Sequence, residues 1–486
     1  MQKIKSIKYN FIMNFILTAS SLIFPLITFP YVSRILLPEG NGKIAFVSSI
    51  ISYFSMFAML GIPTYGIRTC AKVRENKEEL SRTVQELIII NIVTTTITYI
   101  ILIISLFIVP KFEEYRTLII INSIGLILNS FGMNWLYQAL EQYSYITVRS
   151  LIFKVLSILL MFLFIHDKND YILYSAITVF ASSGSNVINI INIRKYIYIK
   201  PVGSYHLKKH IKPIMTFFAM SVATSVYINM DTVMLGFMRS DNEVGLYNAA
   251  VKIKAILTAL VASLGTVLLP RMSYYINTNK KNEFKDMTAK ALNFVILISL
   301  PLTIYFIVYA KEVIMFLSGS NYLGAIPTMQ IITPTIIFIG LTNVLGIQVL
   351  LPLNRERGVL ISVIVGAIVN IAINMILIPK MGADGAALGT LFAEFSVLIV
   401  QTMSLQSILA DIRTKINLRY GMVSCAVASI SIPLLKLVHF NSILTTLIMS
   451  TIVFFCSYGI VLLIQGEPLT KEFIFGKFKK NKLRRT

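Results

Sequence analysis

The stretch FIMNFILTASSLIFPLITFPYV, residues 11–32, decides the class of this protein. It contains no charged residue, and it is long enough to cross a bilayer, for which a helix needs about 20 mostly apolar residues. The basic segment MQKIKSIKYN precedes it, but no clear cleavage site of small residues follows. Signal peptides have such a site and a shorter apolar region. We therefore expect a retained first membrane span.

The composition extends this conclusion to the whole chain. Of its 486 residues, 56% are hydrophobic and only 14% are charged, and the mean hydropathy is +0.75. A soluble domain has roughly 25% charged residues, which help to cover its surface in water. The composition therefore excludes water-soluble globular, disordered and fibrous proteins, and it predicts a polytopic membrane protein.

Apolar segments of similar length recur along the chain, and none alternates apolar and polar residues as the strands of a membrane β-barrel do. We therefore predict an all-α protein with about fourteen membrane-spanning helices. The fifth segment is short and contains Lys154, so twelve or thirteen spans stay open as alternatives. The predicted spans are residues 10–31, 44–62, 87–109, 117–138, 149–165, 171–193, 214–238, 246–269, 288–309, 328–351, 359–378, 385–405, 420–438 and 442–463.

Basic residues concentrate in every second loop. The chain has 44 Lys and Arg residues and a net charge of +22. If both termini are cytoplasmic, the loops on that side hold 31 of these residues, the loops on the other side hold 8, and five lie within spans. Cytoplasmic loops carry such an excess, so we expect both termini in the cytoplasm, at the cell membrane, and no nucleic-acid partner. The basic segment at residues 476–486 favours a topology anchor, with a contact to anionic lipids as the alternative.

The loops are too short to hold a catalytic domain. The longest polar segments, 63–86 and 194–213, have roughly twenty residues each, whereas chains below about 40 residues rarely fold without disulfides or metals. The chain has no P-loop, GxSxG or HExxH motif. His206 and His210 have a spacing that could bind a metal on a helix, but the neighbouring lysines repel cations, so we expect a solvated basic segment. These features favour a secondary transporter, not an enzyme, without cofactor or metal.

Several charged residues fall within or at the mouths of the spans. A charge at the bilayer centre costs about 2.5–3.5 kcal/mol, so such residues usually face a wet cavity or a partner. Basic side chains outnumber carboxylates among them, which favours an anionic substrate such as a phosphate or pyrophosphate. Lys252 and Lys254 lie about 200° apart around a helix, so they cannot line one cavity at the same depth. The candidate substrate-binding residues are Lys252, Arg34, Arg68, Lys154 and Lys254, and the candidates for ion coupling or ion pairing are Asp231 and Glu394.

Four segments resemble the polysaccharide-biosynthesis flippases, the Wzx-type transporters of O-antigen and capsule repeat units, within the multidrug/oligosaccharidyl-lipid/polysaccharide exporter superfamily. They are FPYVSRILLPEGNGKIAF (29–46), LGIPTYGIRTCAKVRENKEE (60–79), INMDTVMLGFMRSDNEVGLYNAAVKI (228–253) and VNIAINMILIPKMGADGAALGTLFAE (369–394). Matching positions include Arg34, Gly42, Gly61, Gly66, Arg68, Asp231, Gly245, Tyr247, Lys252, Asn370, Asn374, Gly385 and Glu394.

The resemblance implies two pseudo-symmetric six-helix lobes around a central cavity. They comprise residues 1–200 with spans 1–6 and residues 201–412 with spans 7–12, followed by two extra spans and a basic tail in 413–486. The segments after the first and seventh spans support this symmetry, since each reaches a glycine before the next span. The implied function is the transfer of an undecaprenyl-pyrophosphate-linked oligosaccharide repeat unit across the membrane by alternating access. Implied partners are this lipid-linked oligosaccharide, H+ or Na+, and other polysaccharide assembly proteins.

Two other functions stay open. A cation-coupled drug or metabolite exporter of the same superfamily uses buried carboxylates, for which Asp231 and Glu394 are the candidates. An intramembrane glycan polymerase or ligase has one large outer loop, whereas the outer loops predicted here are short.

Overall fold

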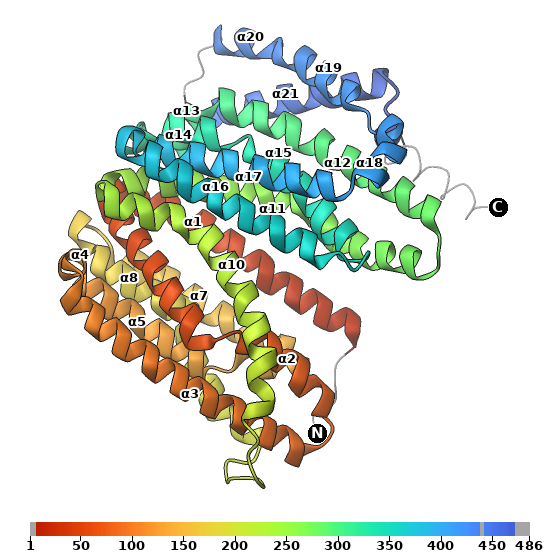
Figure 1. Cartoon of the computed structure of the whole chain (residues 1–486). Coiled ribbons are helices and arrows are strands. Elements are labelled where there is room, and N and C mark those ends of the chain that lie inside the picture. Colours follow the sequence, from red (N-terminus) through yellow and green to blue (C-terminus); the bar gives the residue numbers. More distant parts are fainter. Residues whose placement is uncertain (1–5, 438–441, 472–486) are drawn as a thin grey trace. The chain divides into compact units, whose positions relative to one another are not determined.

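The computed structural model describes residues 6–437 and 442–471, and within these ranges every regular element is a helix (Figure 1). Thirteen helical segments in this part of the chain are long and apolar enough to cross a membrane. The prediction of an all-α polytopic membrane protein is therefore confirmed. The basic segment 476–486 lies outside the described residues.

The first helix contains two of the predicted spans. Helix α1 (Ile7–Met59) has 53 residues, which at 1.5 Å per residue is about 80 Å, more than twice the hydrocarbon thickness of a bilayer. It is broken at Leu37, which has φ 58° and ψ 177°. Leu37 precedes Pro38, and the proline ring disfavours the helical conformation in the residue before it. The expected loop 33–43 is thus a kink within α1. The first of the thirteen segments is long enough to hold two of the predicted spans, and the count of fourteen crossings stays a prediction.

Contacts between Cα atoms divide the chain into two compact units, Met1–Asn248 and Ala249–Thr486. The predicted lobes 1–200 and 201–412 stay a prediction. The first unit contains α1, α2 (Ile62–Val73), α3 (Lys77–Ile108), α4 (Pro110–Glu114), α5 (Arg116–Phe131), α6 (Asn134–Ala139), α7 (Tyr143–Phe164), α8 (Tyr171–Val179), α9 (Asn186–Asn192) and α10 (Lys208–Met238). Short 3-10 helices lie at Lys168–Asp170 and Ile193–Lys195, and a π-helical turn at Phe180–Gly184 joins α8 to α9.

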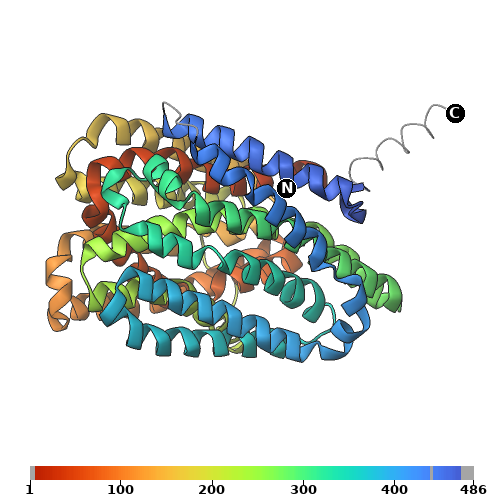
Figure 2. The same ribbon diagram turned by 90° about the horizontal axis from the view of Figure 1, so that it is seen from above.

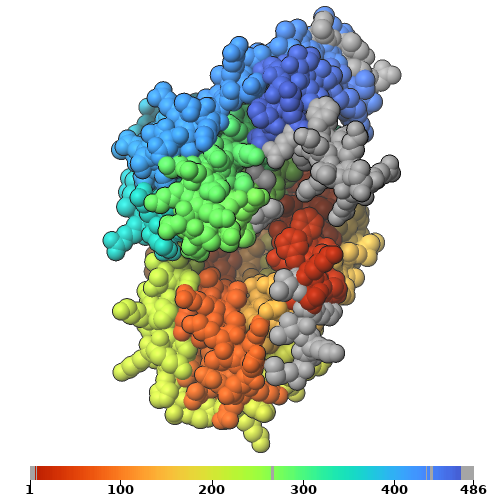
Figure 3. All heavy atoms as spheres, turned by 90° about the vertical axis from the view of Figure 1, so that its right-hand side faces the viewer, coloured from red at the N-terminus to blue at the C-terminus, as the bar shows by residue number. Residues whose placement is uncertain are grey.

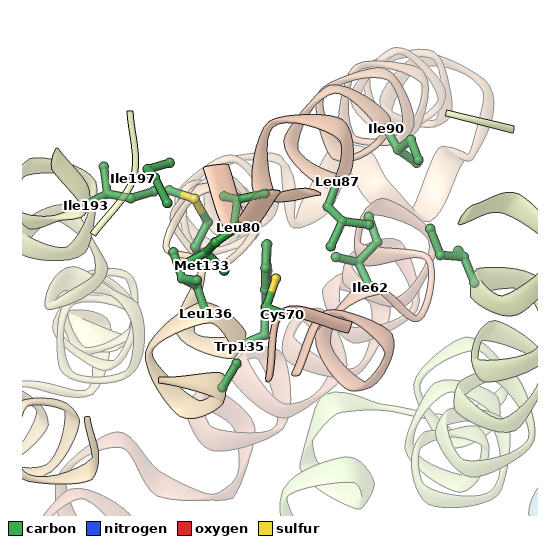
Figure 4. Close-up of a cluster of buried hydrophobic side chains, with 13 residues drawn as sticks. Ile62, Cys70, Leu80, Leu87, Ile90, Met133, Trp135, Leu136, Ile193 and Ile197 are labelled. Atoms are coloured by element: carbon green, nitrogen blue, oxygen red, sulfur yellow. The ribbon is translucent and has the colours of Figure 1, made fainter. Parts of the chain in front are cut away.

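Buried apolar side chains hold α2, α3, α6 and the 3-10 turn Ile193–Lys195 together in the first unit (Figure 4). The ring of Trp135, which is 3% exposed, lies so close to α2 that a Cβ on Gly66 would come within 2.6 Å of it. Glycine at position 66 therefore allows α2 and α6 to approach closely, as small residues do at helix contacts in membranes. Helix α2 also packs beside α10 (Figure 3).

Helix α11 (Asp241–Asn277) begins in the first unit and continues into the second. The second unit further contains α12 (Lys281–Val308), α13 (Ala310–Leu317), α14 (Ala325–Ile332), α15 (Thr335–Asn343), α16 (Glu356–Met381), α17 (Ala383–Ser404), α18 (Gln406–Ile412), α19 (Leu418–Ser429), α20 (Ser431–Leu437) and α21 (Ile443–Ile464). Helices α16 and α17 run side by side from a tight turn at Gly382, and α19 lies beside α21 (Figures 1 and 2). The hydroxyl of Tyr305 in α12 lies 2.9 Å from the hydroxyl of Ser450 in α21, which ties the last span to this unit.

Candidate functional site

The buried carboxylate of Asp231 connects α10 to the beginning of α11. Asp231 is 4% exposed, and its carboxylate accepts a hydrogen bond of 2.7 Å from the hydroxyl of Tyr247. Lys252 follows Tyr247 by five positions in the same helix. A polar hydrogen-bonded pair inside an apolar helix bundle is costly to bury, and in membrane proteins such groups often mark a transport pathway.

The candidate charges of the second unit lie on α11 and α17. Lys252 and Lys254 are half-buried and flank Ile253, which is 3% exposed. Glu394 in α17 is 6% exposed. All three charged side chains are therefore at least partly buried, as a residue that lines an internal binding site must be.

The other predicted basic residues have separate surroundings in the first unit. Arg34 is exposed and donates a hydrogen bond to the backbone oxygen of Pro30 in its own helix. Arg68 is exposed on α2. The ammonium of Lys154 in α7 donates to the hydroxyls of Ser20 and Ser21 in α1, at 2.8 and 3.0 Å. For Lys154 these contacts support a structural link between α7 and α1.

A contact between two glycines joins α1 to α11 at the end of the first unit that loop charge predicts to be extracellular. A Cβ on Gly42 would lie 1.8 Å from the backbone oxygen of Asp241 and 2.9 Å from the nitrogen of Gly245. A Cβ on Gly245 would lie 1.9 Å from the backbone oxygen of Pro38. These are the glycines that follow the first and seventh predicted spans.

At the opposite end of the first unit, the carboxylate of Glu86 in α3 is 0% exposed. It binds three residues at the start of α10 and just before it. It accepts hydrogen bonds from the backbone N–H of His206 at 2.7 Å and from the ammonium of Lys209 at 2.9 Å. The Nε2 atom of His210 lies 2.8 Å from the same carboxylate, and its Nδ1 atom lies 2.7 Å from the hydroxyl of Tyr65.

The expectation of a solvated basic segment around His206 and His210 is wrong for His210. Its side chain is 1% exposed because Glu86 binds it from another helix. Of these two histidines, His206 alone is exposed. The sequence signal for this contact was a carboxylate, Glu86, directly before the third predicted span.

A second polar cluster surrounds Arg149 in α7, a residue that the loop-charge count assigned to a loop. Arg149 is 5% exposed, and its Nη atoms donate to the backbone oxygen of Ser185 at 2.9 Å and to the side-chain oxygen of Asn134 at 2.7 Å. The side chain of Asn189 also donates to Asn134, at 3.0 Å. The signal in the sequence was the asparagines at 186, 189 and 192, spaced to share one face of a helix.

Long apolar helices with short connections and a few buried polar clusters define a polytopic membrane protein. Solved structures share this fold. The lipid II flippase MurJ in an inward closed conformation is 15% identical with a TM-score of 0.70, and the match covers 96% of this chain and 99% of that chain. An inward-facing multidrug resistance MATE family transporter is 14% identical with a TM-score of 0.61, covering 81% of this chain and 95% of that chain.

The family follows from the sequence. The family model described as "Polysaccharide biosynthesis protein" matches residues 7–276, which is more than half of the chain, and a MatE model matches residues 214–376. The chain therefore belongs to the polysaccharide biosynthesis protein family, which confirms the resemblance seen in the four segments. The "Putative O-antigen transporter" of Escherichia coli (strain K12) is 26% identical over 404 residues, which cover 82% of this chain and 96% of that protein.

Proposed function

We propose that this protein is a flippase that moves an undecaprenyl-pyrophosphate-linked oligosaccharide repeat unit of O-antigen, capsule or a related surface polysaccharide across the cytoplasmic membrane by alternating access. The observation that carries the proposal is the family match over residues 7–276. The fold shared with a lipid II flippase and the similarity to a protein named as an O-antigen transporter support it.

The alternatives have less support. A polymerase or ligase needs a large outer loop, whereas the longest predicted outer loop, 311–327, is occupied by most of α13, a 3-10 turn and the start of α14. A cation-coupled drug exporter fits the MATE-like fold and the buried carboxylates of Asp231 and Glu394. The excess of basic residues among the candidate charges favours an anionic cargo instead.

We assign the binding of the pyrophosphate head first to Lys252, with Arg34, Arg68, Lys154 and Lys254 as lesser candidates. Asp231 and Glu394 are proposed for coupling to H+ or Na+ or for ion pairing. Lys252 is placed first because it is half-buried and lies five positions after Tyr247, the residue that binds Asp231. Other polysaccharide assembly proteins, and anionic lipids at the tail 476–486, are further proposed partners.

The function and the role of Lys252 are tested in a host whose own flippase for the matching repeat unit has been deleted. The wild-type chain should restore surface polysaccharide. Lys252→Arg should keep this activity, and Lys252→Ala should lower it at least about tenfold, equivalent to 1.4 kcal/mol, at equal membrane abundance. Lys290→Ala changes an exposed lysine in α12 and is the matched control.

Three results discriminate between the explanations. If Lys252 only pairs with Asp231, the loss in Lys252→Ala should be rescued by Asp231→Asn. Full activity of Lys252→Ala alone would show that Lys252 neither binds the pyrophosphate head nor forms a required pair with Asp231. If the wild-type chain exports a cationic drug but restores no polysaccharide, the exporter function replaces the flippase function.

Loop charge also predicts the orientation of the chain. Ser204 lies in the exposed segment before α10, and Asn169 lies in a predicted outer loop. In intact cells, with the exposed Cys456 replaced by alanine, a membrane-impermeant maleimide should label a cysteine at position 169 and not one at position 204. Strong labelling at position 204 contradicts the proposed cytoplasmic location of this segment.

A further inference from the structure

A cavity of about 700 Å³ lies within the first unit. Its walls come from the start of α1, the first half of α7, the end of α9 and the 3-10 turn that follows α9. It contains none of the residues proposed above for transport. Its lining is polar and aromatic toward one end, with Tyr9, Tyr145 and Lys195, and apolar toward the other, with Ile152 and Ile188.

Arg149 gives the cavity a buried positive charge. Its Nη atoms contact only neutral oxygens, those of Ser185, Asn134 and Asn186, and its Nε atom has no acceptor among the described residues. No carboxylate in the described part of the chain bonds to it. A buried charge is normally paired, because an isolated one is expensive to remove from water. The cavity therefore favours an anion.

The rim adds to this positive field. Lys195 is exposed at the end of the 3-10 turn and follows Arg194. The nearby carboxylate of Glu141 bonds to Arg74 at 2.6 Å, and Asn10 also donates to it. None of the residues that line the cavity in the described chain is acidic. Arg149 and Lys195 thus line the cavity, and no carboxylate lines it among the described residues.

The apolar side of the cavity opens toward the surface of the helices. Val148, Ile152 and Ile188 are 52%, 53% and 39% exposed, and in a protein of this class such side chains face hydrocarbon. Tyr145 and Tyr196 have rings with polar tips, the type of side chain that is enriched at the membrane interface. A ligand that satisfies both ends has an anionic head and an apolar tail.

Arg149 lies near the end of its span that loop charge predicts to be cytoplasmic. Arg149 lies six residues from the start of α7 at Tyr143, which is about 9 Å along a helix. The headgroup region of a bilayer is about 5–8 Å thick on each side, so Arg149 lies just below it when α7 begins at the membrane surface, and an arginine side chain at this depth reaches toward the headgroups. Tyr9, Tyr143 and Lys195 all lie at the end of their spans that loop charge predicts to be cytoplasmic.

We propose that this cavity binds the phosphate of an anionic lipid from the cytoplasmic leaflet. Arg149 and Lys195 supply the positive charge for the phosphate, and an acyl or polyprenyl chain lies along Ile152 and Ile188. The phosphate belongs either to a membrane phospholipid or to the polyprenyl carrier, since both present a phosphate joined to hydrocarbon. The site is separate from α10 and α11, so it does not depend on the proposed role of Lys252.

The test measures lipid binding to the full-length protein in detergent by native mass spectrometry and by lipid-dependent thermal stabilisation. The probes are phosphatidylglycerol, cardiolipin, undecaprenyl pyrophosphate, uncharged dioleoylglycerol and inorganic phosphate. The wild-type protein should bind the anionic lipids and not dioleoylglycerol. Lys195→Ala should weaken binding of phosphatidylglycerol roughly fivefold, the usual effect of one basic residue at an anionic surface. Lys208→Ala, at an exposed lysine outside the cavity, is the matched control.

Further variants separate a ligand site from a purely structural role of Arg149. Arg149→Lys keeps the charge and should retain binding in part, and Ile152→Asn should weaken lipid binding without changing the yield of folded protein. Stronger competition by cardiolipin than by undecaprenyl pyrophosphate assigns the site to phospholipids, and the reverse assigns it to the carrier. Equal binding of phosphatidylglycerol by wild type, Lys195→Ala and Ile152→Asn overturns the proposal, as does stabilisation by inorganic phosphate alone.

Discussion

Replacing Gly42 by alanine is expected to abolish surface polysaccharide and to destabilise the folded protein by about 3 kcal/mol, the upper end of the usual cost of overpacking. The new Cβ would lie 1.8 Å from the backbone oxygen of Asp241. A backbone atom cannot rotate away as a side chain can, so α1 and α11 must move apart. Overpacking of a close contact costs typically about 1–3 kcal/mol and occasionally more. Gly245→Ala should behave alike, because its Cβ would lie 1.9 Å from the backbone oxygen of Pro38.

The measurement is thermal unfolding of the purified protein together with the polysaccharide assay. Gly459→Ala is the matched control, since a Cβ there meets no atom within 4 Å and alanine is the better helix former. It should leave activity unchanged and should not lower the unfolding temperature. If Gly42→Ala and Gly245→Ala both unfold at the wild-type temperature, the two helices do not approach each other as closely as described.

Replacing Glu86 by alanine is expected to cost about 1–3 kcal/mol, as leaving buried hydrogen-bonding groups without their partner does. Glu86 is 0% exposed and is bonded to the ammonium of Lys209, the ring of His210 and the backbone N–H of His206. Without the carboxylate, His210 remains buried opposite Tyr65 and loses its partner at Nε2. The start of α10 should then detach from α3.

Thermal unfolding and protease sensitivity of the segment before α10 measure this effect. Glu86→Gln should be intermediate, because an amide oxygen still accepts a hydrogen bond but has no charge for Lys209. Glu79→Ala, at an exposed carboxylate in the first turn of the same helix, is the control and should change little. Wild-type stability of Glu86→Ala would show that the carboxylate does not hold α10.

The apolar helices could be predicted from the sequence because each depends on a local property. Each crossing needs an apolar run that matches the bilayer, and its backbone hydrogen bonds are satisfied within the helix itself. The run 11–32 therefore indicated a span without knowledge of its neighbours. The boundary after it was less certain, since a loop was expected over 33–43 where the structure has a kink at Leu37.

The four segments that resemble the family contain glycines whose role in packing the structure explains. Gly42, Gly66 and Gly245 match the family pattern, and each permits a close approach that a Cβ would block. Their spacing in the sequence did not indicate what they approach. Gly66 meets the ring of Trp135, and Gly42 meets the start of α11, 199 positions later at Asp241.

Composition, apolar runs and loop charge alone indicated the class, the apolar spans and the expected orientation of this protein, because all three can be counted along the chain. Only the tertiary structure decided which polar groups meet. Glu86 and His210 are 124 positions apart, and the backbone oxygen that Arg149 binds belongs to a residue 36 positions later. A buried charge takes its partners from whichever helices pack beside it, and helix periodicity specifies which face is polar but not which helix covers it.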